Sequence, residues 1–275
     1  ESAVENGLTW LAKHQSPTGE WAGRDFDRHC PKNDSCMTLN ASGDGVYTHG
    51  ITALCVLSYL GAGYTPTSGV HADTLKRAVD FLIESQRETG GLDGEYDINL
   101  YNHAIATWAL SEPYGVTRDD KYRLPAQKAI DYLARTQYDG GGWDYYFQRD
   151  PQAERNDTSI AGWAVMAMRS GQIAGLAVPE TMIAKVKKLI AGRTDPKTGE
   201  LIYAEKKPGV NRKGSGLLAV GQKAVAICVH AAAFGGPGAL PEKDRVSDGD
   251  RVPEEDDLGV AVVLGGAGRL VRRRR

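Results

Sequence analysis

The sequence predicts an all-α fold in which helical hairpins repeat and stack side by side. Three observations lead to this prediction: a short loop motif recurs along the chain, an apolar stripe with helical spacing precedes each copy of the motif, and a nearly uncharged apolar segment follows each copy. Similar units that recur at intervals of roughly 50 residues are typical of repeat architectures, in which each hairpin buries its apolar face against its neighbours.

The loop motif is a glutamine, a glycine four residues later and a large apolar residue six residues later. Its copies are "QSPTGEW" (Gln15, Gly19 and Trp21), "QRETGGL" (Gln86, Gly90 and Leu92) and "QYDGGGW" (Gln137, Gly141 and Trp143). A fourth copy is degenerate, because Arg193 replaces the glutamine and Gly199 and Leu201 come two residues late. We expect the glutamine amide to bridge backbone groups of neighbouring repeats, the glycine to adopt a left-handed cap, and the tryptophan to pack over it.

An amphipathic helix is predicted before each copy of the motif. Apolar residues lie four, seven and eleven positions before the glutamine, or before its replacement in the fourth copy. These residues are Leu11, Leu8 and Val4; Leu82, Val79 and Leu75; Leu133, Ile130 and Ala126; and Leu189, Val186 and Met182. Polar residues such as Lys76, Lys128 and Lys187 occupy the other faces. We therefore expect an outer helix in each hairpin, with one side in water.

A second segment of different character follows each loop. The three clear copies are "THGITALCVLSYLGAGY" from residue 48, "NHAIATWALSEPYG" from residue 102 and "DTSIAGWAVMAMRSGQIAG" from residue 157, and a weaker copy is "GSGLLAVGQKAVAICV" from residue 214. These segments are apolar almost all round, which is typical of helices buried on more than one face. We expect such inner helices to line a concave centre where the stacked hairpins curve.

The composition excludes several classes of function. A formal net charge of -2 over 275 residues, with Lys and Arg spread among Asp and Glu, provides no basic surface for nucleic acid. No long apolar run is present, so the sequence predicts no transmembrane segment. Because the chain begins at Glu1 without an initiator methionine or a leader, we interpret it as a mature or excised fragment. An extracytoplasmic or membrane-associated location is our working hypothesis.

With these repeats identified, the sequence resembles the terpenoid cyclase and protein prenyltransferase superfamily, whose barrels of paired helices carry Gln, Gly and Trp repeats. The resemblance covers residues 1–222 and extends to squalene-hopene cyclases and to bacterial proteins with prenyltransferase and squalene oxidase repeats. It implies an α/α toroid whose inner helices surround a cavity, which binds isoprenoids in the enzymes. The four hairpins predicted here fall short of a closed ring, so we expect an incomplete or open toroid.

Squalene-type cyclases resemble one another in a motif of Asp, any residue, Asp, Asp, Thr and Ala at the start of an inner helix, in which the central Asp protonates an alkene. The similar stretch here is "ERNDTS" at residues 154–159, and Asn156 stands where the acid would be. Because an amide cannot deliver a proton, this difference argues against hopene-type cyclisation. Asp157 is then a catalytic candidate, although its position before an apolar run is also typical of a helix N-cap.

Protein prenyltransferases hold zinc with Asp, Cys and His side chains. Potential donors here are His29, Cys30, Asp34, Cys36 and His49. Asp34 and Cys36 fall in an insertion of the first repeat rather than on an inner helix, so they do not match the family's ligand positions. We therefore predict no metal site and no cofactor, and we prefer a local disulfide between Cys30 and Cys36.

Polar residues open the predicted inner helices at matched positions. Aligned on Ile51, Ile105 and Ile160, the residues two positions earlier are His49, His103 and Thr158, and those three positions earlier are Thr48, Asn102 and Asp157. Capping of the helix ends and a shared binding site both explain this pattern, and under the second interpretation His49 and His103 are catalytic or ligand-binding candidates and Thr158 is a ligand-binding one. Trp108 and Trp163 also match in register, and they are predicted either to pack between helices or to bind isoprene units.

We predict one repeat domain over residues 1–234 and a separate tail over residues 235–275. The tail is charged and contains Pro and Gly, which is typical of disorder or of a gene-end artefact. Our leading hypothesis is a repeat protein whose concave cavity binds an isoprenoid or another apolar ligand and lacks the cyclase acid. The alternative is a non-catalytic module of a larger bacterial extracytoplasmic protein that holds a polypeptide.

Overall fold

The computed structural model describes residues 2–24, 26–32, 45–92, 99–145, 156–195, 197 and 201. Within these residues the helices are α1 (Ser2–Lys13), η1 (Phe26–His29), η2 (Gly45–Tyr47), α2 (Thr48–Gly61), α3 (Ala72–Glu84), α4 (Leu100–Thr117), α5 (Asp120–Arg135), α6 (Thr158–Ala174) and α7 (Glu180–Arg193), of which η1 and η2 are 3-10 helices. The described residues form no β-strand, and their β-structure is limited to isolated bridges such as Thr65–Ser68 and Thr194–Leu201. The predicted all-α fold is therefore confirmed.

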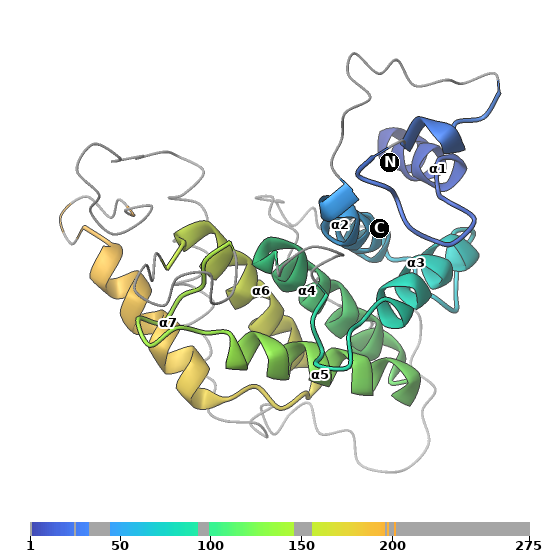
Figure 1. Ribbon diagram of the computed structural model, residues 1–275. Helices are drawn as coiled ribbons and strands as arrows, with labels where there is room; N and C mark the ends of the chain where they lie inside the picture. Colours follow the sequence, from blue (N-terminus) through green and yellow to red (C-terminus); the bar gives the residue numbers. More distant parts are fainter. Residues whose placement is uncertain are drawn as a thin grey trace, which may run out of the picture.

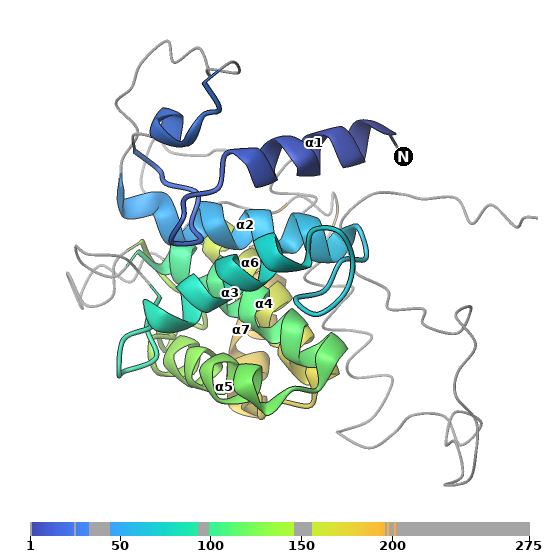
Figure 2. The ribbon, with the colours of Figure 1, turned by 90° about the vertical axis from the view of Figure 1, so that its right-hand side faces the viewer.

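The helices form two curved layers. The outer helices α1, α3, α5 and α7 follow the convex side of an arc, and the inner helices α2, α4 and α6 lie on its concave side (Figure 1). The central inner helix α4 packs against α2, α6 and α5. In the turned view, α3 lies in front of α4 and α6, and α5 lies below them (Figure 2). Outer and inner helices alternate along the chain, as expected for the hairpins of an α/α toroid.

The outer helices bury the predicted apolar stripe. In α3 the side chains of Leu75, Val79 and Leu82 have no exposed surface, and the equivalent residues of α5 are buried to the same extent. The prediction was wrong for Val4, which is 56% exposed near the start of α1. Because α1 stands at one end of the described row, no described hairpin covers this edge of the helix, and its part of the stripe stays open to solvent.

The inner helices are buried more completely than the outer ones. Most of α4 is buried, including Thr107 and Ser111, whose hydroxyls donate to the carbonyl oxygens one turn earlier at 2.7 and 2.8 Å. These bonds satisfy polar groups that would be costly to bury unpaired. The predicted fourth inner helix, the domain boundary at residue 234 and the tail over residues 235–275 lie outside the described residues.

Candidate functional site

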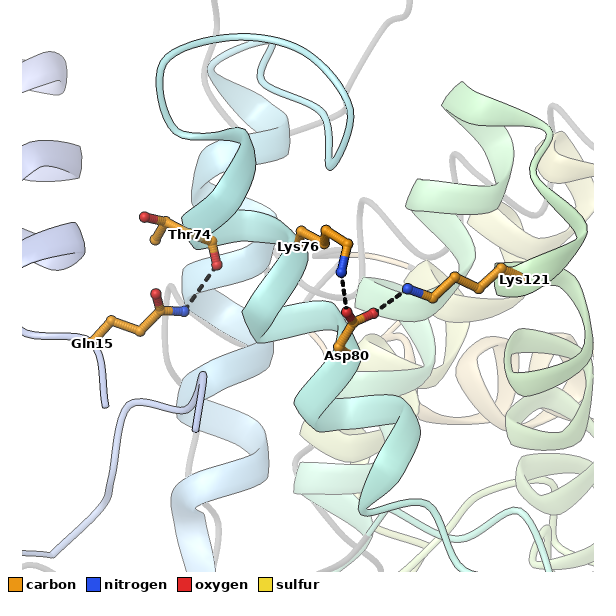
Figure 3. Close-up of polar contacts among 5 residues, drawn as sticks. All are labelled: Gln15, Thr74, Lys76, Asp80 and Lys121. Carbon is orange, nitrogen blue, oxygen red and sulfur yellow. Dashed lines mark hydrogen bonds and ion pairs between the residues drawn. The ribbon is translucent and has the colours of Figure 1, made fainter. Parts of the chain in front are cut away.

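The glutamine of each loop motif joins two consecutive outer helices. Gln15 Nε2, just after α1, donates to Gly19 O at 2.8 Å and to Thr74 O in α3 at 2.9 Å, and Figure 3 shows the second bond. The amides of Gln86 and Gln137 donate in the same way to Gly90 O at 3.2 Å and Gly141 O at 3.0 Å, and to Pro125 O in α5 and Met182 O in α7, both at 3.0 Å. One acceptor lies in the loop and the other in the next outer helix in all three complete copies.

The glycine of each motif lies against the backbone of the next outer helix. Gly19, Gly90 and Gly141 have φ values of 104°, 93° and 93°, a region that residues with a side chain rarely adopt. A Cβ atom at any of the three would lie closer than 3.0 Å to a carbonyl oxygen of that helix. These oxygens belong to Arg77, Lys128 and Lys185. Both the backbone conformation and the close approach of the next helix therefore require glycine.

The tryptophan of the motif holds the loop to the helix that precedes it. Trp21 Nε1 donates to Leu11 O and Trp143 Nε1 donates to Leu133 O, both at 2.9 Å. In each copy the acceptor lies four residues before the glutamine, in the last turn of the outer helix. Leu92 cannot make this bond, but its side chain is as fully buried as that of Trp143. Where the motif has tryptophan, the side chain thus donates a hydrogen bond to a carbonyl in the last turn of the outer helix, in addition to its packing.

An ion-paired carboxylate adds a second connection between α3 and α5. Asp80 accepts hydrogen bonds from Lys76 Nζ at 2.7 Å and from Lys121 Nζ at 2.5 Å (Figure 3). Burial opposes ionisation of Asp80, but the two ammonium groups outweigh it and hold the pKa of the carboxyl below its ordinary value. Because both lysines are well exposed to solvent, each pair is expected to contribute no more than about 1 kcal/mol.

Arg193, which replaces the glutamine in the degenerate fourth copy, contacts an inner helix. Its Nη1 atom donates to Thr158 Oγ1 at 2.8 Å and to the carbonyl oxygen of Asn156. Arg193 and Thr158 are both almost completely buried. Thr158, which the sequence presented as a capping or ligand-binding residue, therefore lies in the contact between α6 and α7.

His103 lies in the core with both ring nitrogens bonded to the backbone. Leu92 N donates to Nδ1 at 3.2 Å, so Nε2 carries the proton and donates to Ala129 O at 3.0 Å. Burial is the main cause that lowers the pKa of His103 to about 3, against the opposing effect of the bond to Ala129. The imidazole joins α4 to the second motif loop and to α5. This geometry favours the structural interpretation of His103 over the catalytic one.

His49 differs from His103 in that one of its ring nitrogens neither accepts nor donates a hydrogen bond among the described residues. It lies half-buried at the start of α2, with its ring centroid 5.4 Å from that of Phe81. Burial and then Arg87 lower the pKa of His49, while Glu20 raises it. Among the described residues, nothing hydrogen-bonds to its buried Nδ1 atom. Of the two candidate histidines, His49 is therefore the better placed to bind a ligand.

Asn156 and Asp157 are the two residues directly before α6, and their side chains bind backbone groups there. Asn156 has a left-handed φ of 48°, and its Oδ1 atom accepts a hydrogen bond from Gly142 N at 2.9 Å. Asp157 Oδ1 caps the helix by accepting from Ser159 N and Ile160 N at 2.9 and 3.1 Å. The N-cap interpretation of Asp157 is thus confirmed. At the position that the resemblance assigns to the cyclase acid, Asn156 therefore has a structural role, because its side chain binds the backbone of the third motif loop.

A chain of side-chain hydrogen bonds that sequence reasoning missed joins α4 to α6. Tyr101 Oη bonds to Ser159 Oγ, and Ser159 Oγ donates in turn to Asp157 Oδ1. Burial is the main cause that raises the pKa of Tyr101 to about 12, so the phenol stays protonated and donates toward Ser159. Tyr101 and Ser159 each lie in the first turn of an inner helix, and that shared position was the only sequence signal of their contact.

The inner helices share a set of apolar residues at matched positions, which we call the inner face. It consists of Ile51 and Leu54 in α2, Ile105 and Trp108 in α4, and Trp163 and Met166 in α6. The two residues of each pair lie three positions apart and are less buried than the residues beside them. The ring centroids of Trp108 and Trp163 are 6.1 Å apart, and Trp108 Nε1 donates to Glu112 Oε1 at 2.8 Å. The two tryptophans therefore pack against each other between α4 and α6.

The insertion of the first repeat carries the remaining predicted site. Cys30 is half-buried, and Asp34 and Cys36 lie outside the described residues, so the disulfide between Cys30 and Cys36 stays a prediction. In the described part of the chain, no three His, Cys, Asp or Glu side chains are arranged to hold a metal ion. None of the helices that the structure describes is both long and apolar enough to cross a bilayer.

Comparison with known sequences relates this chain to one family. The family model described as squalene-hopene cyclase C-terminal domain matches residues 1–190. The squalene–hopene cyclase of Bradyrhizobium diazoefficiens is 26% identical over 189 residues, which are 63% of this chain and 26% of that protein. The squalene–hopene cyclase of Zymomonas mobilis is 26% identical over 149 residues, 52% of this chain and 21% of that protein. The matched region thus spans about a quarter of the length of these relatives.

Comparison with solved structures supports the fold alone. An inactive variant of the α-1,6-mannanase of a Salegentibacter species superimposes with a TM-score of 0.57 at 12% identity, over 84% of this chain and 65% of that one. A sugar epimerase from a ruminal bacterium gives a TM-score of 0.51 at 15% identity, over 84% of this chain and 68% of that one. At such low identity, these similarities indicate a shared arrangement of paired helices and say nothing about activity.

Proposed function

We propose, from the premise that this chain belongs to the squalene-hopene cyclase C-terminal domain family, that its inner face binds an isoprenoid or a similar apolar ligand. The chain is a cyclase-like repeat protein with an α/α-toroid fold. Its relatives are named squalene–hopene cyclases, and squalene is an isoprenoid hydrocarbon. A ligand of this class is therefore the first to test.

The observation that supports the proposal is the pair of tryptophans on the inner face, with aliphatic side chains beside them. Trp108 and Trp163 meet between α4 and α6. Leu54, which is 42% exposed, and the half-buried Ile51 and Met166 extend the same apolar surface. Isoprene units bind such surfaces because both partners are apolar and lose contact with water when they meet.

The expected affinity is moderate. Each methylene-sized group that leaves water contributes about 0.8 kcal/mol, so roughly ten buried carbons of a farnesyl chain would contribute about 8 kcal/mol. Loss of translational and rotational freedom on binding removes several kcal/mol of this gain. The remainder corresponds to a dissociation constant of about a millimolar or somewhat below, which calorimetry and thermal unfolding both detect.

We do not include cyclisation in the proposal. Asn156 stands at the position of the acid, and its side-chain oxygen is bonded to Gly142 N. An amide cannot protonate an alkene. Asp157, the neighbouring carboxylate, is fully buried and caps α6. Binding without turnover is therefore the function that this arrangement supports best.

Titration with farnesyl and geranylgeranyl analogues, followed by calorimetry and by the melting temperature, tests the proposal. We expect binding heat, a raised melting temperature and an affinity about tenfold weaker in Trp163→Ala, because one of the two ring surfaces is lost. Trp10→Ala is the matched control, since Trp10 is 43% exposed on α1 and lies outside the inner face. Its affinity should be unchanged.

Two results would contradict the proposal. If neither analogue produces heat or shifts the melting temperature, the isoprenoid ligand is wrong, and the polypeptide-binding alternative is favoured. If squalene is converted by the chain, binding without turnover is wrong, and Asp157 becomes the first acid to test by Asp157→Asn.

A further inference from the structure

Hydroxyl side chains stand at one end of the inner face. In each described inner helix, a residue with a hydroxyl group lies four positions before the first residue of the inner face. Residues at this spacing share one face of a helix, one turn apart. We call these three residues the hydroxyl level: Tyr47 directly before α2, Tyr101 in α4 and Ser159 in α6, which precede Ile51, Ile105 and Trp163.

The hydroxyl level and the tryptophans lie along the same contact between α4 and α6. At the start of the two helices, Tyr101 Oη bonds to Ser159 Oγ. Farther along them, the ring centroids of Trp108 and Trp163 are 6.1 Å apart. Tyr101 and Ser159 are only half-buried. A ligand that lies along this contact therefore meets hydroxyl oxygens at one end and aromatic carbon beyond them.

Both hydroxyl protons of this contact are directed toward Asp157. Ser159 Oγ donates to Asp157 Oδ1, an oxygen that also accepts from two backbone N–H groups. Since a hydroxyl has one proton, Tyr101 Oη is the donor in its bond to Ser159. Neither hydroxyl has a proton left for a ligand, but a hydroxyl oxygen accepts up to two hydrogen bonds. The pair of Tyr101 and Ser159 therefore offers acceptors and no donors.

Such a pair of acceptors favours one kind of head group. A neutral O–H group can donate to either oxygen. An ionised phosphate or carboxylate has no proton to donate, and the carboxylate of Asp157 would repel it. A hydrocarbon end would take water from the two oxygens without replacing its hydrogen bonds. An alcohol therefore fits this end of the inner face better than an anion or a hydrocarbon.

We propose that the hydroxyl level binds the terminal O–H group of a prenol, an isoprenoid alcohol, whose chain lies along the inner face. The ligand's hydroxyl donates to Tyr101 Oη or Ser159 Oγ, and its chain points toward Trp108 and Trp163. This inference rests on the isoprenoid binding proposed above, to which it adds the head group and the orientation of the ligand. No covalent bond forms or breaks, as expected for binding without turnover.

Three ligands with the same carbon chain separate the head group from the chain. They are farnesol, farnesyl methyl ether, which lacks the O–H donor, and the hydrocarbon farnesene. Binding to the full chain is measured by calorimetry and by tryptophan fluorescence. We expect farnesol to bind about tenfold more tightly than the ether, because the ether cannot donate to Tyr101 or Ser159. Farnesene reports on binding of the chain alone.

The variant Tyr101→Phe/Ser159→Ala removes both acceptors and keeps the tryptophans. Both changes are needed, because Ser159 Oγ could still accept from the ligand if Tyr101 alone were replaced. We expect the preference for farnesol over the ether to disappear, while the affinity for farnesene changes by less than about twofold. Tyr114→Phe is the matched control, because Tyr114 is a half-buried tyrosine of α4 outside the hydroxyl level and the inner face. It should leave the preference unchanged.

Ser159→Ala alone gives a second test, which needs only one small substitution. Without Ser159 Oγ, the Tyr101 hydroxyl loses the acceptor of its proton and can donate to the ligand instead. The methyl ether accepts such a bond, so its affinity should rise by about threefold to tenfold. A merely structural role of Ser159 would not strengthen binding of the ether.

Three results would overturn the inference. Equal affinity of farnesol and the ether for the wild-type chain would exclude a hydroxyl-specific head-group site, and binding of farnesene would then leave the proposed function in place. A preference for farnesol that persists in the double variant would exclude Tyr101 and Ser159 as the acceptors. If none of the three ligands binds up to its solubility limit, both the isoprenoid proposal and this inference are wrong.

Discussion

Replacement of Gly90 by alanine tests whether the motif loop after α3 is packed tightly against the backbone of α5. Gly90 has φ 93°, and a Cβ atom there would lie closer than 3.0 Å to the carbonyl oxygen of Lys128 in α5. Holding an alanine at positive φ costs about 1–2 kcal/mol, and overpacking against a backbone that cannot move adds about 1–3 kcal/mol. If the loop shifts to relieve the collision, the bond from Gln86 to Pro125 O is lost instead, at about 1 kcal/mol. The free energy of unfolding should therefore fall by about 2–5 kcal/mol.

Urea unfolding followed by circular dichroism measures this change, with Gly192→Ala as the control. Gly192 is also a glycine of the described outer helices, but it lies in the last turn of α7, its φ is not positive, and a Cβ atom there would meet nothing within 4 Å. Gly192→Ala should stabilise the chain by up to about 1 kcal/mol, since alanine is the better helix former. A loss of less than about 1 kcal/mol in Gly90→Ala would refute the idea that the loop is pressed against α5.

Three further predictions follow from the same contacts. Gln86→Ala should lower the free energy of unfolding by about 1–3 kcal/mol in urea unfolding, because two partly buried carbonyls lose their donor. Trp21→Phe should cost about 1 kcal/mol through the lost bond to Leu11 O, measured in the same way. For His103, the folded pKa of about 3 lies below the ordinary value of 6.5, so below pH 6.5 the unfolded chain binds the extra proton. The free energy of unfolding should then fall as the pH drops from 6.5 toward 3, by up to about 1.4 kcal/mol per pH unit. His103→Gln should flatten this slope, and an unchanged slope would show that His103 does not cause it.

The hairpins and their order were predictable because they depend on local periodicity. Apolar residues at four, seven and eleven positions before each glutamine place one face of a helix in the core whatever the neighbour is. The recurrence of Gln, Gly and a large apolar residue at constant offsets showed that one local structure repeats. The exposure of Val4 could not be predicted in this way, because the same stripe is covered in α3 and open in α1 according to which helices lie beside it.

The candidate site was predictable only in part. The sequence placed His49, His103 and Thr158 at matched starts of the inner helices, which the helix bounds support to within a turn. It did not distinguish their roles, because a buried polar side chain takes its role from its partners. His103 meets Leu92 N and Ala129 O, and Thr158 meets Arg193, each from another segment of the chain.

The sequence by itself thus determined the repeat, the helical character of its segments and the need for glycine in the loops, because these follow from side-chain periodicity and backbone sterics. Only the tertiary structure decided that the motif glutamine reaches the next outer helix, that Tyr101 bonds to Ser159, and that Val4 is exposed. Tyr101 and Ser159 are 58 positions apart in the chain, and Gln15 and Thr74 are 59 apart. Contacts over such separations depend on how the layers curve and stack, which no local pattern encodes.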